Sequence, residues 1–209
     1  MRTLNFYLLR HGKVEGEPAL YGHTDVSVAS EKQQAICRTL LELNLPIEYV
    51  VTSPLKRCAD LARLLQQMKQ TLVLRECDGF KEMDFGLYDG VPFEQLKDQW
   101  PVLEQFWQQP ATHSLPQAES LQSFHQRISQ SWQDLVDNAQ GDTLLICHGG
   151  TIRMILASIL GLEWTNSALF SVLQIANQSL THIKITISES TYPQVCFIGT
   201  PLQLSLPRL

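Results

Sequence analysis

The sequence is poor in the features that mark disulfide-rich and metal-bound proteins. It has five cysteines, an odd number, and no two of them form a C-x-x-C pair. Widely separated cysteines of this kind are typical of reduced thiols in a cytosolic protein, and they argue against a disulfide framework or a zinc site. The five are Cys37, Cys58, Cys77, Cys147 and Cys196.

The sequence also lacks an excess of positive charge and a long apolar run. Its net charge is -5, so it has no general attraction to nucleic acid or to an acidic membrane surface. The longest apolar stretch, 154–162, is far below the ~20 residues that span a bilayer. The N-terminus runs straight into an apolar strand pattern without a cleavable signal sequence. We therefore expect a cytoplasmic protein that has neither nucleic acid nor a membrane as a partner.

Two apolar runs, each followed by a histidine, stand out in what the sequence does contain. Residues 4–9 form the first run, which leads to His11, and residues 143–147 form the second, which leads to His148. Such runs predict strands buried in a sheet, and open α/β sheets bind their ligands beyond the carboxyl ends of their strands. If the two strands are parallel neighbours, both histidines lie at one edge of one sheet.

Strand and helix patterns alternate along the chain, and this alternation predicts an α/β protein with a mainly parallel sheet covered on both faces. The length of 209 residues fits one domain, 1–209, with a small helical and loop insertion at about 77–118. Apolar and polar residues alternate in 180–187, which places that strand toward an edge of the sheet. Strands are expected at 4–9, 47–52, 72–74, 143–147, 169–175, 180–187 and 195–198, and helices from Ser30, from Ser53, over 121–136 and over 151–160.

Two serines are expected to open helices. Ser30, with Gln33 three residues later, fits a capping box. Ser53 followed by Pro54 is also a favourable helix start, with a capping hydroxyl and a proline at the first helical position. This start puts Arg57 in the first turn of its helix, close to the edge where the preceding strand ends.

The residues expected at this edge suit a phosphate ligand. Two arginines and two histidines without paired carboxylates indicate a bound dianion, because the planar guanidinium matches phosphate oxygens and keeps its charge. A neutral histidine in such a pocket is a competent nucleophile toward phosphorus. A metal site built from His11, His148 and Glu82 is disfavoured, because the adjacent arginines would repel a cation. Backbone amides that glycine leaves accessible are expected to add donors to the phosphate at Gly12, Gly149 and Gly150.

Four motifs occur in a fixed order over roughly residues 4 to 160. They are Leu9-Arg10-His11-Gly12, then Ser53-Pro54-Leu55-Lys56-Arg57-Cys58, then Glu82-Met83-Asp84-Phe85-Gly86 with Asp89-Gly90, and finally His148-Gly149-Gly150 with Ile152-Arg153. Together they resemble the histidine phosphatase superfamily, which includes the cofactor-dependent phosphoglycerate mutases. The resemblance implies a phosphoglycerate mutase-like three-layer α/β/α sandwich and a phosphoric monoester hydrolase that uses neither a metal nor a cofactor.

The same resemblance implies a role for each residue of the edge. His11 is the residue that becomes phosphorylated. Arg10, Arg57 and His148 bind the phosphoryl group and stabilise the charge of its transition state. Glu82 is the general acid that protonates the leaving oxygen, and then the base that activates water. Phosphoryl transfer of this kind depends mainly on positioning and on charge neutralisation.

Two further motifs resemble the α-ribazole phosphatase branch of the family, which removes phosphate from a benzimidazole riboside late in cobalamin nucleotide-loop assembly. They are Leu20-Tyr21-Gly22-His23-Thr24-Asp25 and Ala118-Glu119-Ser120. This resemblance implies a small phosphorylated metabolite as partner, with His23, Thr24 and Lys13 among the substrate contacts. The sequence departs from the usual threonine, asparagine and glycine of the pattern at Val14, Glu17 and Ala118.

Several alternatives stay open from the sequence. One function is a phosphohistidine-forming phosphatase for α-ribazole phosphate, and a second is a broad-specificity phosphatase for sugar or nucleotide-like phosphates. A third is a non-catalytic phosphate-binding protein, against which the complete set of reactive residues argues. The aromatic residues of the insertion, Trp100, Phe106 and Trp107, either stack on a substrate heterocycle or simply pack the insertion. The chain is expected to be a monomer or a homodimer.

Overall fold

The computed structural model describes residues 1–202, and their strands form one sheet in the order β3-β2-β4-β1-β5-β6. Strand β1 pairs with β4, β4 with β2, and β2 with β3, all in parallel, whereas β5 and β6 add two antiparallel pairings. The expectation of a mainly parallel sheet is thus confirmed. The strands are β1 (Arg2–Arg10), β2 (Tyr49–Thr52), β3 (Val73–Glu76), β4 (Thr143–Cys147), β5 (Ser179–Ile187) and β6 (Thr191–Pro201).

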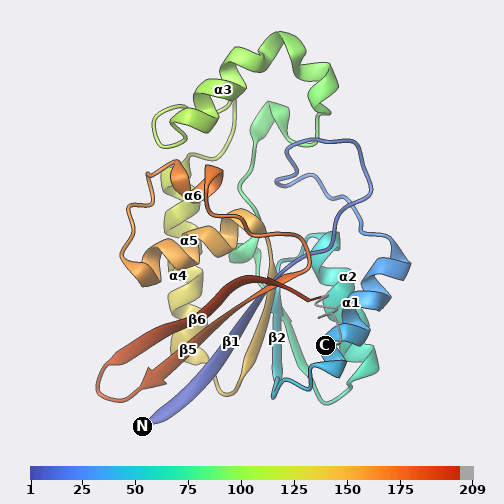
Figure 1. The fold of residues 1–209 in the computed structure, drawn as a ribbon, viewed down its shortest axis with the longest axis vertical. Helices are drawn as coiled ribbons and strands as arrows, with labels where there is room; N and C mark the ends of the chain where they lie inside the picture. The colour runs from blue at the N-terminus through green and yellow to red at the C-terminus, as the bar shows by residue number, and fades with distance from the viewer. Residues whose placement is uncertain (203–209) are drawn as a thin grey trace, which may run out of the picture.

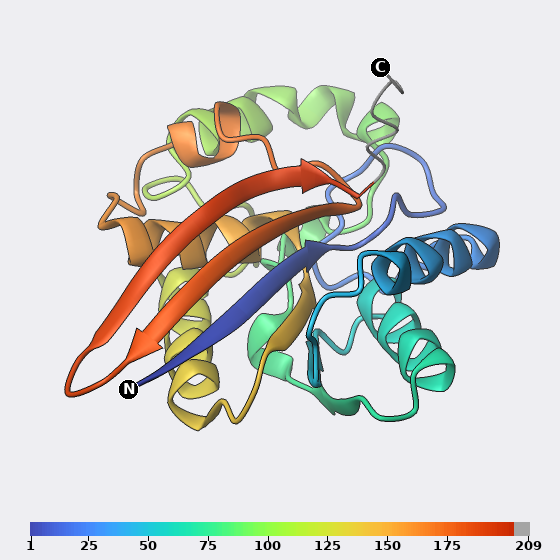
Figure 2. The same cartoon turned by 60° about the horizontal axis from the view of Figure 1, so that its bottom comes forward.

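Helices cover both faces of this sheet, which gives the three layers expected from the sequence. Helices α1 and α2 pack on one face, and α4 and α5 pack on the other (Figures 1 and 2). None of the helices in residues 1–202 is long and apolar enough to cross a membrane. The α-helices are α1 (Ser30–Glu42), α2 (Lys56–Met68), α3 (Trp100–Gln108), α4 (Leu121–Asn138), α5 (Gly149–Leu160) and α6 (Ala168–Ser171).

Strand β1 is buried on both faces because its alternate side chains enter two different cores. Phe6 and Leu8 pack with α4 and α5, and the ring of Phe6 meets that of Trp132 edge-on at 5.2 Å between centroids. Tyr7 and Leu9 point the other way and pack with α1 and α2. Packing on both sides holds the strand firmly, and so fixes the position of the residues that follow its carboxyl end.

Two expectations about the C-terminal third are wrong. The run 169–175 is not a strand, because its first residues form α6 and its apolar ends, Leu169 and Ile175, are buried in the core beside α5. Short apolar runs of this kind do not distinguish a strand from other buried segments. Strand β5 does not lie at an edge either, because β6 pairs along its whole length and forms the edge itself.

The two predicted serine caps are also wrong. Ser30 is already the first residue of α1, and its N-cap, Ala29, has no side chain that can accept a hydrogen bond. Helix α2 begins three residues after Ser53, and its first amide, that of Lys56, donates instead to the carboxylate of Asp25 at 2.7 Å. The first turn of α2 nevertheless contains the arginine that the sequence placed there.

Within the segment 77–118, α3 lies at the opposite end of the molecule from the N-terminus (Figure 1), whereas Phe80 and Met83 are buried in the same core as α4. The segment also contains the 3-10 helices η1 (Asp78–Phe80), η2 (Gly86–Tyr88) and η3 (Phe93–Gln99). The rings of Phe93, Trp100 and Trp107 pack edge to face on one another. A single domain over 1–209 stays a prediction, and its last residues, 203–209, lie outside those described.

Candidate active site

Three neighbouring parallel strands end side by side, and a polar side chain follows each of them. His11 follows β1, Ser53 follows β2 and His148 follows β4. The amide of His11 donates to the carbonyl of Cys147 at 3.1 Å, so the loop after β1 starts in contact with the end of β4. The rings of the two histidines lie 5.2 Å apart between centroids. The convergence expected from the sequence is present at this edge.

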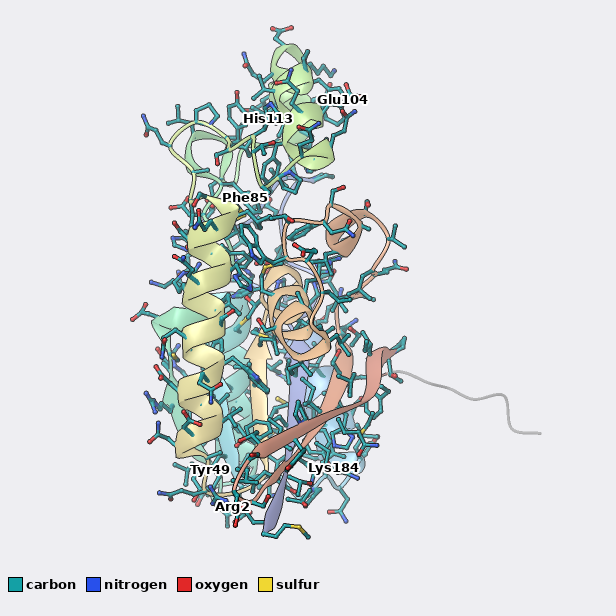
Figure 3. All side chains as sticks on the ribbon, turned by 90° about the vertical axis from the view of Figure 1, so that its left-hand side faces the viewer. Arg2, Tyr49, Phe85, Glu104, His113 and Lys184 are labelled. Carbon is teal, nitrogen blue, oxygen red and sulfur yellow. The ribbon has the colours of Figure 1, made fainter. Side chains whose placement is uncertain are left out.

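A cavity of about 350 Å³ opens beside His11. One part of its wall is polar and one part is apolar and aromatic. In Figure 3, Phe85, which lines the cavity, lies toward the end that carries Glu104 and His113, while Tyr49 and Arg2 mark the opposite end. The polar lining residues are Arg10, His11, Lys13, Tyr21, Glu82, Arg153 and Asn177, and the apolar ones include Val14, Leu20, Met83, Phe85, Phe106, Trp107, Pro110 and Phe170.

The tautomer of His11 follows from its hydrogen bond. The ring is only 7% exposed, and its Nδ1–H donates to the carbonyl of Gly12 at 2.7 Å. This leaves the lone pair of Nε2 free. Burial, together with the charges of Arg57 and Arg10, lowers the pKa of His11 to about 3. The imidazole is therefore neutral at physiological pH and suited to act as a nucleophile.

His148 is fully buried behind His11 and is held at both ring nitrogens. Its Nδ1 accepts from Nε of Arg57 at 3.2 Å, so its Nε2–H donates to the hydroxyl of Ser53 at 2.8 Å. Burial and the charge of Arg57 hold the pKa of His148 well below its usual range. This histidine does not line the cavity, and it meets the site through its neighbours.

Arg57 is also fully buried, and most of its donors are used by the loop after β1. Its Nη1 donates to the carbonyl of Thr24 at 3.0 Å, and its Nη2 donates to the carbonyls of Tyr21, at 3.1 Å, and Gly22. The side chain therefore ties this loop to His148. Arg57 contacts His148, whose ring packs on that of His11, and so brings a positive charge close to His11. Arg57 is nevertheless not part of the cavity wall.

Asp89 holds the same loop from the amide side. Its carboxylate accepts hydrogen bonds from the backbone N–H groups of Gly22, His23 and Thr24, at 3.2, 2.7 and 2.9 Å. His23 and Thr24 thus take part through their backbones and do not line the cavity. The side chain of His23 lies 3.5 Å from Asp84, an acidic group that the sequence left without a role.

Two guanidinium groups flank the first turn of α5. Among the described residues, the buried Nε of Arg10 has no hydrogen-bond partner, and its Nη1 donates to the carbonyl of Ile175. Nε of Arg153 donates to the carbonyl of Leu173 at 3.1 Å. A Cβ on Gly149 would lie 3.0 Å from Arg153 and 3.4 Å from Arg10, so glycine leaves room for both. The cavity thus contains donors that an anion can use.

Glu82 is fixed at the N-terminus of α5. Its Oε2 accepts from the amide of Gly150 at 2.9 Å, and its Oε1 accepts from the amide of Met83 at 3.1 Å. A Cβ on Gly150 would overlap the carboxylate, so only glycine allows this approach. The positive end of the helix dipole favours an acidic group at this position.

Some residues of the site escaped the sequence analysis. Ser53 was interpreted as a helix cap, and only the pairing of β2 with β4 places it beside His148. Asn177 carries a turn signal, yet its side chain lines the cavity and donates to the carbonyl of His11 at 3.1 Å. Of the departures from the branch pattern, Val14 lines the cavity, whereas Glu17 is exposed and outside it. Residues 1–202 contain no group of three or more His, Cys, Asp or Glu placed to hold a metal ion.

The family model described as the histidine phosphatase superfamily (branch 1) matches residues 6–194. The chain belongs to this superfamily. As a histidine phosphatase it is a phosphoric monoester hydrolase, and its fold is the phosphoglycerate mutase-like fold. It is 26% identical over 191 residues to a putative phosphoserine phosphatase 2 of Hydrogenobacter thermophilus, an alignment that covers 88% of this chain and 91% of that one.

Solved structures share the fold of this histidine phosphatase. A mycobacterial glucosyl-3-phosphoglycerate phosphatase superposes with a TM-score of 0.80 at 20% identity, covering 95% of this chain and 100% of the other. A putative alpha-ribazole-5'-P phosphatase from Escherichia coli superposes with a TM-score of 0.76 at 18% identity, covering 95% and 98%. At these identities the likeness concerns the fold and leaves the substrate open.

Proposed function

We propose that this histidine phosphatase hydrolyses phosphomonoesters through a phosphohistidine formed on His11. The observation that carries the proposal is the fixed tautomer of this ring, whose Nδ1–H is bound to the carbonyl of Gly12. Because burial also keeps the ring neutral, the Nε2 lone pair is available at neutral pH. Arg10 lines the same cavity with an unpartnered Nε among the described residues. A neutral nucleophile and a cationic donor thus share one space.

In the first step, a bond forms between Nε2 of His11 and phosphorus while the bond from phosphorus to the leaving oxygen breaks. Glu82, in its protonated form, gives its proton to that oxygen. Arg10 and Arg57 stabilise the charge on the transferring phosphoryl group. His148, which lies behind His11, helps to stabilise the same charge. Phosphate contacts from the exposed Lys13, which lines the cavity, are part of the same proposal.

In the second step, water attacks phosphorus and the bond to Nε2 of His11 breaks. Glu82, now a carboxylate, takes a proton from the water. The amides of Gly12 and Gly149 are proposed as further donors to the phosphoryl oxygens. His23 and Thr24 are proposed to act indirectly, because the loop that they belong to binds the Arg57 guanidinium.

We propose α-ribazole phosphate as the preferred substrate, a role in cobalamin nucleotide-loop assembly and a cytoplasmic location. The apolar part of the cavity supports this choice, because a planar heterocycle can pack on the faces and edges of its aromatic rings. These rings belong to Phe85, Phe106, Trp107 and Phe170. The fold is also shared with proteins that carry the name alpha-ribazole phosphatase. A sugar or amino-acid phosphate would leave this aromatic wall unused.

A broad-specificity phosphatase is the second candidate, and the resemblance to a putative phosphoserine phosphatase favours it. The two are separated by kcat/KM on α-ribazole phosphate, phosphoserine, a sugar phosphate and 3-phosphoglycerate. A clear preference for α-ribazole phosphate is expected, and equal values on all four would overturn the substrate assignment.

The covalent intermediate is tested by rapid acid-free quenching with a radiolabelled phosphomonoester. An acid-labile, alkali-stable label is expected on the wild-type chain and not on the His11→Ala variant. Turnover without such a label would contradict the phosphohistidine route. If the protein binds phosphate but hydrolyses none of the esters, it is a phosphate-binding protein and the proposed catalysis is wrong.

A further inference from the structure

The loop that carries Glu82 is held by one arginine of α4. Arg127 binds the carboxylate of Glu119 through Nε and Nη2, at 3.0 and 2.7 Å. Its Nη1 donates to the carbonyls of Gly79 and Lys81, both at 3.0 Å, and its Nη2 also reaches the carbonyl of Glu82 itself at 3.3 Å. A single guanidinium thus binds the backbone on the N-terminal side of the proposed general acid and at that residue.

Glu119 holds the loop on the C-terminal side of Glu82. Its amide donates to the carbonyl of Asp84 at 3.0 Å, and its Oε2 accepts from the amide of Asp84 at 3.4 Å. The backbone is therefore held both before and after Glu82. The carboxylate of Glu119 is only 16% exposed, and the Arg127 side chain 26%, so water competes weakly for this pair.

The geometry depends on the shape of a guanidinium. Its planar fork binds a carboxylate through two donors and still has N–H groups that point to the loop carbonyls. A lysine ammonium carries the same charge but cannot reach all of these acceptors at once. The ring of Phe124 packs under Arg127, with Cζ 5.2 Å from the ring centroid, and this contact fixes the plane of the guanidinium further.

We infer that Arg127 is a positioning residue for proton transfer by Glu82, with Glu119 as its counter-ion. The inference rests on the proposed function, because it assumes that Glu82 protonates the leaving oxygen. Neither residue lines the cavity, so any effect on the reaction passes through the loop. The inference also gives Glu119, part of the Ala118-Glu119-Ser120 motif, a physical role at the site.

Leaving-group dependence separates positioning from general support of the fold. An alkyl phosphate needs a proton on its leaving oxygen, whereas 4-nitrophenyl phosphate releases a stable anion and needs little help. A displaced Glu82 therefore slows the alkyl ester selectively, and misplacement by about 1 Å costs on the order of 100-fold. If a variant only lowers the fraction of folded protein, kcat/KM falls by the same factor on both esters.

The experiment measures kcat/KM for both esters with Arg127→Gln, Arg127→Lys, Glu119→Gln and Glu82→Gln. For Arg127→Gln we expect a loss of about 10- to 100-fold on the alkyl ester and less than about 3-fold on 4-nitrophenyl phosphate. Arg127→Lys and Glu119→Gln are expected to show smaller losses with the same selectivity. The matched control is Arg63→Gln, because Arg63 on α2 is likewise ion-paired, with Asp60 and Glu76, but does not line the cavity.

The outcomes distinguish the inference from the function on which it rests. If Glu82→Gln slows both esters equally, the general-acid role is wrong, and the proposal for Arg127 falls with it. If Glu82→Gln is selective but Arg127→Gln slows both esters equally, or neither, only the positioning role is overturned. Thermal unfolding of each variant confirms that the folded protein is assayed. Should Arg127→Gln fail to fold, the selectivity of Glu119→Gln decides by the same criterion.

Discussion

In the polar part of the cavity wall, His11, Arg10 and Glu82 extend from a strand end and from a loop bound to the first turn of α5, and each has fixed backbone partners. In the apolar part, Trp107 comes from α3 and Phe170 from α6, both outside the sheet, and the Phe170 ring lies 5.9 Å from Cζ of Arg153. His11 is 7% exposed, whereas Trp107 is 36% exposed. Arg10 and His11 thus come from the sheet and the residue after it, Glu82 comes from the loop after η1, and Trp107 and Phe170 come from helices outside the sheet.

This difference determines how activity responds to substitutions in the polar part of the wall (the polar end) and in the apolar part (the apolar end). The polar end acts through oriented hydrogen bonds and charge, whose contribution to the rate falls steeply when one atom moves. The apolar end works through contact area, which is non-directional and is lost gradually. Large effects on rate are therefore expected at the polar end, and modest effects on substrate preference at the apolar end.

The largest effect is expected from His11→Ala. Without the imidazole there is no nucleophile for phosphorus, so kcat/KM should fall by about 1,000-fold or more on every phosphomonoester. The fold should persist, because the strand packing of β1 is untouched. Steady-state hydrolysis together with circular dichroism measures both. Residual activity within about 10-fold of wild type would show that the phosphoryl group takes another route.

A large and more selective effect is expected from Gly150→Ala. The new methyl group overlaps the carboxylate of Glu82, which swings away because it ends a flexible side chain. We expect kcat/KM to fall by about 100-fold while the free energy of unfolding changes little. The control lies at the other end of the same helix, where Gly161 has φ of 63° and an added Cβ would meet no atom within 4 Å.

Gly161→Ala should show the opposite pattern. It forces a side chain into the left-handed conformation, so it should lower stability by about 1 kcal/mol and leave kcat/KM unchanged. Urea unfolding and hydrolysis rates of the two variants give the comparison. If Gly150→Ala also costs stability and keeps its activity, the close approach of Glu82 to α5 is structural and not catalytic.

The sequence predicts the polar end well for a physical reason. Short continuous apolar runs are typical of strands buried on both faces of a parallel sheet, and the residue after such a strand lies at the carboxyl edge. The local pattern put His11 and His148 each after a buried strand, and their common edge follows from the parallel pairing of β1 with β4, which the sequence left as a condition. Arg57 was placed because a helix that follows a strand starts at the same edge.

The remaining features depend on contacts between segments far apart in the chain. Ser53 is a plausible cap by local rules, but the amide of Lys56 is bound by Asp25, and the serine faces His148. Arg127 lies on a helix whose pattern shows only its buried face, and nothing local pairs it with the loop at Glu82. Such long-range partners are set by packing, which a single sequence does not reveal.

A moderate effect is expected in the pH dependence of stability. An imidazole in the unfolded chain takes up a proton below pH ~6.5, whereas His11 in the folded chain stays neutral down to a pKa of about 3. Between these values the folded state binds fewer protons, so the stability that is present above pH ~6.5 is lost as the pH falls toward 3.

The His11→Asn variant should remove part of this loss. Its amide keeps a donor for the carbonyl of Gly12 but does not titrate. Between pH 7 and pH 5, the decrease in the free energy of unfolding should be smaller by about 2 kcal/mol than in the wild type, as urea titrations at each pH will show. An unchanged pH dependence would mean that His11 is not held neutral by the fold.

The smallest effect is expected from Trp107→Ala, and it decides between the two interpretations of the insertion. If Trp107 packs on a substrate heterocycle, the variant should lose about 2- to 10-fold in kcat/KM on α-ribazole phosphate and nothing on phosphoserine. Trp100→Ala is the matched control, because its ring packs on that of Trp107 at 5.3 Å between centroids but does not line the cavity. Equal losses on both substrates, or equal effects of both variants, would show that the aromatic residues only hold the insertion together, and the contrast between the two ends would then lie in stability and not in recognition.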